Sequence, residues 1–182
     1  MWPASWEVDT VHDGIPSFLV SVDGSHFKIN EPSTGPTAKD PKYYSHKFQQ
    51  SALNYELALS IYEQKLVWIN GPFPASRHDI TIFREEGGLL SKIPEGCRVI
   101  ADNGYNGEAK VVSTPNPHDH PLVRSLKSVA RSRQEAFNGR MKRFKCLDMC
   151  FRHGEHKHAI VFEAVAVICQ FELENGSPLF DV

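Results

Sequence analysis

The order of two hydrophobic patterns along the chain limits its fold more than any other feature. Short runs rich in β-branched and aromatic residues fill the first part, and apolar residues at helical spacing fill the last third. Strands are expected at 18–29, 55–63, 65–73 and 97–102, and helices at 80–90, 122–144 and 155–173. This order predicts an α/β domain with a central mixed sheet, whose first three strands are antiparallel, flanked by helices.

Length and composition predict one core domain. A chain of 182 residues, 41% of them hydrophobic, can bury one sizeable core. We expect this domain at 18–175, after an irregular leading segment at 1–17 and before a frayed tail at 176–182. No apolar run is long enough to cross a membrane, and the first residues do not resemble a signal peptide. Four cysteines are too few for a disulfide scaffold, so we expect free thiols and no secretion.

The charge is distributed unevenly. Residues 124–145 carry eight basic side chains and one acid, a net charge of +7, which leaves −9 for the rest of a chain whose total is −2. Such a segment is a candidate surface for a polyanion, because a protein that neutralises phosphates releases their condensed counterions. The alternative is a solvated helix face.

Two aspartates stand where strand-type runs are expected to end. Asp23 precedes Gly24 at an expected turn, and Asp102 closes the run 97–102. Glu135 on the long helix is the third candidate, and three such carboxylates suit a hard divalent cation such as Mg²⁺.

A further acid and its neighbour offer rival roles. Asp79 is interpreted as a helix N-cap, with metal binding as the alternative. For His78 beside it, we expect a role in structural hydrogen bonding rather than in proton transfer. Five cysteines and histidines invite a zinc interpretation, but their spacing lacks the long loop of familiar zinc fingers, which favours buried thiols and a histidine-rich turn. They are Cys146, Cys150, His153, His156 and His158.

The long helix combines acid and base on one face. Glu135 and Lys142 follow Arg131 by four and eleven residues, so at about 100° per residue all three point in nearly the same direction. A metal-binding carboxylate between phosphate-binding cations suits phosphodiester chemistry. An ordinary ion-paired surface helix is the alternative.

Three blocks of sequence carry a family resemblance. SVDGSHFKI surrounds Asp23, VIADNGYNG surrounds Asp102, and ARSRQEAFNGRMKRF surrounds Glu135, with WINGPFPASRHDITIF between the first two. Together they resemble the DDE-type transposases of the Harbinger superfamily and related bacterial insertion-sequence transposases. Arg131, Glu135 and Lys142 match the R-(3)-E-(6)-K part of the bacterial signature, although Ser128 stands where that signature has tyrosine.

The resemblance implies an RNase H-like fold and a metal-dependent DNA endonuclease that cleaves and transfers strands. It implies that Asp23, Asp102 and Glu135 are catalytic and hold Mg²⁺ or Mn²⁺, as two ions. The cations expected to bind DNA phosphates are Arg131, Lys142, Arg140 and Arg143.

Two other functions remain open, and partners follow from the resemblance. One is a catalytically inactive, transposase-derived module that binds DNA or protein, and the other is an RNase H-like nuclease unrelated to transposition. DNA is the expected partner, and because no helix-turn-helix precedes residue 18, target recognition is expected from a separate protein or a region outside this chain. A homo-oligomer is a further option. The expected location is the nucleus in a eukaryote, otherwise the cytoplasm.

Overall fold

A mixed sheet of six strands forms the centre of the fold. The computed structural model describes residues 11–12, 15–31 and 40–182. Strands β4 and β6 both pair with β5, and from β5 the order continues through β3 and β7 to β8. The expected mixed α/β class is confirmed, and the arrangement is consistent with an RNase H-like fold. The strands are β3 (Phe18–Lys28), β4 (Tyr44–Ser45), β5 (Gln50–Ser60), β6 (Leu66–Pro74), β7 (Arg98–Ile100) and β8 (Val112–Ser113).

Strand directions divide the sheet into two parts. The pairs β3–β5 and β5–β6 are antiparallel, whereas β3–β7 and β7–β8 are parallel. The turn expected at Asp23–Gly24 is wrong, because β3 continues through both residues, which pair with Leu57 and Glu56 of β5. An Asp-Gly pair favours a turn locally, but the ladder with β5 keeps this segment extended.

The described residues form four α-helices around the sheet. The helix expected at 80–90 is shorter, because Gly87 has a φ of 75° and separates α1 from a 3₁₀ turn at Leu89–Lys92. The helix expected at 122–144 begins with Pro121 at its first position and ends at Met141. The helices are α1 (Asp79–Phe83), α2 (Pro121–Met141), α3 (Lys145–Asp148) and α4 (Glu155–Glu174).

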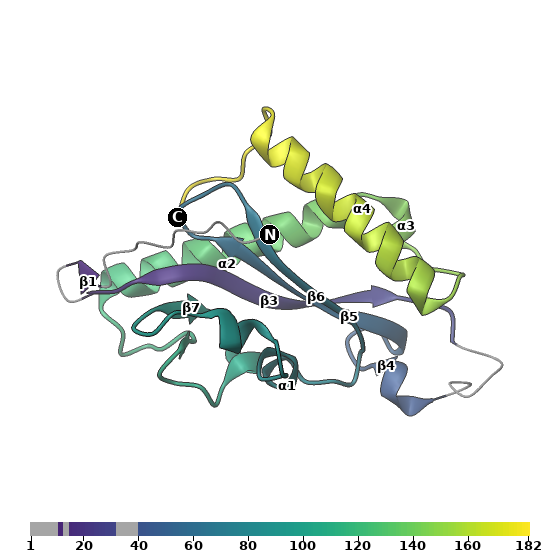
Figure 1. Ribbon diagram of the computed structural model, residues 1–182, viewed down its shortest axis with the longest axis horizontal. Helices are drawn as coiled ribbons and strands as arrows, with labels where there is room; N and C mark the ends of the chain where they lie inside the picture. Colours follow the sequence, from purple (N-terminus) through teal and green to yellow (C-terminus); the bar gives the residue numbers. More distant parts are fainter. Residues whose placement is uncertain (1–10, 13–14, 32–39) are drawn as a thin grey trace.

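The helices cover the two faces of the sheet. In Figure 1, α2 and α4 lie on one side of the long strands and α1 lies on the other. Alternate residues of β5 serve the two layers, since Leu57 packs with Phe137 of α2 and Phe162 of α4, whereas Ala58 packs with Phe83 of α1. Strand β5 is therefore buried on both faces.

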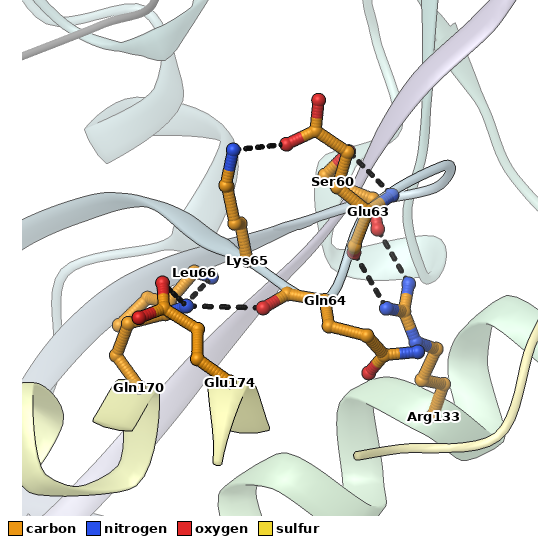
Figure 2. Close-up of polar contacts among 8 residues, drawn as sticks. All are labelled: Ser60, Glu63, Gln64, Lys65, Leu66, Arg133, Gln170 and Glu174. Atoms are coloured by element: carbon orange, nitrogen blue, oxygen red, sulfur yellow. Dashed lines mark hydrogen bonds and ion pairs between the residues drawn. The ribbon is translucent and has the colours of Figure 1, made fainter. Parts of the chain in front are cut away.

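The turn between β5 and β6 is held by two helices, as Figure 2 shows. Arg133 of α2 is 1% exposed, and its guanidinium donates to the backbone carbonyls of Ser60 and Glu63. Gln170 of α4 donates to the carbonyl of Gln64 and accepts from the amide of Leu66. Arg133 is thus a structural residue and does not contribute to a basic surface.

The leading segment and the tail both contain ordered contacts. Within the segment 1–17, β1 (Val11–His12) pairs antiparallel with β2 (Ile15–Pro16), while 1–10 and 13–14 lie outside the described residues. The tail is not frayed at Leu179, which is 7% exposed and exchanges two hydrogen bonds of 2.8 and 2.9 Å with the side-chain amide of Gln64. Among the helices described, none is long and apolar enough to cross a membrane.

Candidate active site

The register of two parallel strands places Asp23 beside Asp102. Ser21 of β3 is in register with Ile100 of β7, and each aspartate lies two residues further along its own chain. Side chains two residues apart in a strand point to the same face. β7 ends at Ile100, so Asp102 lies just beyond it, and its Oδ1 accepts a 2.8 Å hydrogen bond from the amide of Gly104.

Helix α2 docks against this part of β3 through two amide side chains. The carbonyl oxygen of Gln134 accepts from the hydroxyl of Ser21 at 3.0 Å, and one turn later Asn138 donates to Oδ2 of Asp23 at 2.7 Å. Residues four apart on α2 therefore contact residues two apart on β3. These contacts fix the face of α2 that carries Glu135.

The two elements enclose a pocket of about 430 Å³. The three predicted carboxylates and two of the predicted phosphate-binding cations line it, as the helical spacing of Arg131, Glu135 and Lys142 predicts. The lining also includes Lys47, from the turn between β4 and β5. The charged residues of the lining are Asp23, Asp102, Glu135, Lys47, Arg131 and Lys142.

The surroundings of Asp23 raise the pKa of its carboxyl group. Burial and the nearby carboxylates of Asp102 and Asp79 raise its pKa from 3.8 to about 6, against the opposing charge of Lys47 and the hydrogen bond from Asn138. At neutral pH these acids therefore repel one another in a partly desolvated site. A bound cation would relieve that repulsion.

Asp79 lies behind the pocket. Successive side chains of a strand point to opposite faces, so a Cβ at Gly24 would point away from the face that carries Asp23. That Cβ would collide with Oδ1 of Asp79, which therefore lies on the opposite face of β3. A Cβ at Gly104 would lie 2.9 Å from both Oδ1 of Asp102 and Oδ2 of Asp79, so these two oxygens are separated by no more than twice that distance.

The carboxylate of Asp79 has a hydrogen-bond partner as well as an acidic neighbour. Asn54 donates to its Oδ1 at 2.9 Å, while burial and the charge of Asp102 raise its pKa above the ordinary value. The predicted N-cap role is wrong, because His78 holds that position and Asp79 is the first residue of α1. The His78 side chain is exposed and makes no capping bond.

Two predicted phosphate-binding cations point elsewhere. Arg140 donates to the carbonyl of Ser177, and Arg143 pairs with Glu172 of α4 at 2.9 Å. Neither lines the pocket, although Arg140 lies on the same helix as Arg131 and Arg143 follows just after its end. Sequence reasoning also missed Asn138 and Lys47. The step of three residues from Glu135 to Asn138 was a usable signal, whereas nothing in the sequence places Lys47 near Asp23.

The donor set suits a divalent cation without forming a finished cage. Carboxylate oxygens are the ligands that Mg²⁺ and Mn²⁺ prefer. Oδ1 of Asn138, a side chain 8% exposed, has no hydrogen-bond partner among the described residues. Within the described part of the chain, no three His, Cys, Asp or Glu side chains already stand together as metal ligands. Glu135 must therefore turn toward the two aspartates to join them. The same finding gives no support to a zinc site at residues 146–158.

Comparison with known proteins agrees with this geometry. Fold and site define an α/β protein with a pocket of three carboxylates and three cations beside the parallel strands β3 and β7. The sequence profile of the family described as DDE superfamily endonuclease matches residues 22–170, a span that includes Asp23, Asp102 and Glu135. The chain belongs to this family. No significant match was found among curated proteins or solved structures.

Proposed function

We propose that this protein is a divalent-metal-dependent DNA endonuclease that forms the catalytic domain of a Harbinger-type transposase. The observation that carries the proposal is the pocket in which Asp23, Asp102 and Glu135 face Arg131 and Lys142, in a chain of the DDE superfamily endonuclease family. Carboxylates and cations in one pocket match the two needs of phosphodiester cleavage, which are metal binding and phosphate binding.

Each side chain has a distinct role in this proposal. Asp23, Asp102 and Glu135 would hold Mg²⁺ or Mn²⁺, as two ions, which when bound supply activation of a water or DNA 3′-hydroxyl and charge stabilisation of the leaving oxygen. Arg131 and Lys142 bind the phosphate oxygens on either side of the carboxylates. Asn138 keeps Oδ2 of Asp23 oriented through its 2.7 Å hydrogen bond.

Nicking of supercoiled plasmid DNA tests the proposal without knowledge of a target sequence. Wild-type protein is expected to nick with Mg²⁺ or Mn²⁺ and to stop in EDTA. Asp23→Asn, Asp102→Asn and Glu135→Gln should each lower the rate about 100-fold or more, because a lost ligand forfeits several kcal/mol of transition-state stabilisation. Circular dichroism checks that each variant is folded, and Glu86→Gln, at an exposed position outside the pocket lining, serves as the matched control.

The assay also separates the alternatives. Folded wild type that binds plasmid in EDTA but never nicks it would overturn the enzyme and establish an inactive DNA-binding module. Cleavage of RNA–DNA hybrids in preference to duplex DNA would indicate an RNase H-like nuclease unrelated to transposition. If DNA is the substrate, a separate protein or a helix-turn-helix region recognises the target sequence. The protein then acts in the nucleus of a eukaryotic cell.

A further inference from the structure

Three lysines from three separate segments meet at one side of the pocket. Lys28 is the last residue of β3, Lys47 lies in the turn between β4 and β5, and Lys142 caps the C-terminal end of α2. Lys47 and Lys142 line the pocket itself. The ammonium groups of Lys28 and Lys142 lie 5.1 and 5.9 Å from the ring centre of Phe48, so both are within reach of its face.

These lysines lack acidic partners. Among the ion pairs of the described residues, none includes Lys28, Lys47 or Lys142. Burial and the charge of Lys47 lower the pKa of Lys142, with a smaller contribution from Lys28, while the charges of Asp23 and Asp148 oppose this effect. Like charges brought together in the fold without paired carboxylates are costly, and a polyanion would neutralise them.

The turn that carries Lys47 is fixed to the sheet. Ser45 accepts backbone hydrogen bonds from Phe48 and Gln49, and its hydroxyl lies 2.8 Å from Nδ1 of His26 on β3. The ring of Phe48 meets the His26 ring edge-on, with 6.4 Å between centres. The backbone that carries Lys47 is therefore ordered before a ligand binds, which lowers the cost of binding.

We infer that Lys28, Lys47 and Lys142 form a phosphate-binding track, which continues from the pocket along Phe48 and holds the DNA strand next to the cleaved bond. The inference rests on the proposed function, since it takes DNA as the substrate. It adds two contacts from β3 and the β4–β5 turn to those of α2. Lys47, which lines the same pocket as Asp23, binds the phosphate closest to the reacting one.

The salt dependence of DNA binding tests the track. The affinity for a fluorescein-labelled DNA duplex is measured by anisotropy in EDTA, between about 50 and 200 mM salt. Lys47→Gln and Lys28→Gln should each reduce the slope of log K against log salt by about 1, and the double variant by about 2. Lys47→Arg should keep the wild-type slope, because it keeps the charge.

Controls distinguish this inference from the function on which it rests. Lys92→Gln and Lys110→Gln remove exposed lysines that are not part of the pocket lining and should leave the slope unchanged. Lys47 and Lys28 variants with the same slope as these controls would overturn the track, while metal-dependent nicking by wild type would leave the endonuclease standing. Wild type with no salt-dependent DNA binding and no nicking would overturn both.

Discussion

At the scale of single residues, Glu56 is a carboxylate with no access to water. It is 0% exposed on β5, where it pairs with Gly24, and its Oε2 accepts a 2.8 Å hydrogen bond from the indole of Trp68. Burial, reinforced by the charge of Asp79, raises its pKa from 4.5 to about 7. Because it sits on the α1 side of the sheet, it lies outside the pocket lining.

The raised pKa predicts how stability changes with pH. The pKa of Glu56 in the folded protein exceeds its ordinary value of 4.5. The stability that Glu56 contributes to the fold is therefore fully present below about pH 4.5 and is lost as pH rises through 7. We expect Glu56→Gln, which can still accept from Trp68, to exceed wild type by about 2 to 3 kcal/mol at pH 8 and to show no gain at pH 4.5. Urea unfolding at both pH values measures this difference, with the exposed Glu86→Gln as the control. A gain of equal size at both values would contradict the assignment.

The basic side chains of 124–145 show which residue-scale features a sequence does not reveal. Their summed charge predicts a polyanion surface, yet Arg133 and Lys127 are buried against oxygen partners, and Arg140 and Arg143 bond to the C-terminal part of the chain. Only Arg131 and Lys142 of the eight line the pocket. Burial of a cation depends on which carbonyls lie opposite it, and that follows only from the tertiary packing.

At the scale of elements, α2 joins the site to the rest of the sheet. The part of this helix that lines the pocket also includes Gln134 and Asn138, which bond to β3. Arg133 reaches the turn between β5 and β6. The position of Glu135 therefore depends on contacts made by its neighbours in the helix.

Removing the anchor at Arg133 should weaken the fold. Arg133→Met preserves much of the side-chain length but leaves the carbonyls of Ser60 and Glu63 without their charged donor. We expect a loss of about 3 kcal/mol in the free energy of unfolding, because each hydrogen bond to a charged group contributes about 1.5 to 3 kcal/mol. Guanidinium denaturation measures it. Arg124→Met, at an exposed position of the same helix, should change stability by less than about 0.5 kcal/mol, and an equal effect of the two would refute the anchor.

Elements were predictable where a pattern is long. The helical spacing at 122–144 and the apolar run at 155–173 correspond to α2 and α4, within a few residues at their ends. Two strand features were not predicted, because the local sequence signal and the tertiary packing conflict there. Asp23–Gly24 is a turn signal inside a paired strand, and Val112–Ser113 is a strand of two residues just before a proline-rich turn, held by its pairing with β7.

At the scale of the whole molecule, the site depends on three segments far apart in sequence. Parallel register brings Asp102 beside Asp23, and α2 brings Glu135 over both. The carboxylates themselves were identifiable from their sequence blocks and the helical spacing. The place of Asp79 behind the pocket and of Lys47 at its side was not. Asp79 begins α1 and Lys47 lies in the turn between β4 and β5, and the packing of both segments against the sheet follows only from the folded structure.

A crystal structure with Mn²⁺, located by its anomalous scattering, tests the central claim most directly. We predict a Mn²⁺ peak coordinated by Asp23 and Asp102 at roughly 2.0 to 2.6 Å, with Glu135 turned toward it. The peak should be absent or much weaker in Asp102→Asn crystals soaked in the same way. Wild-type crystals that bind Mn²⁺ elsewhere, or that show the three carboxylates on separate surfaces, would contradict a metal-dependent nuclease site in this pocket.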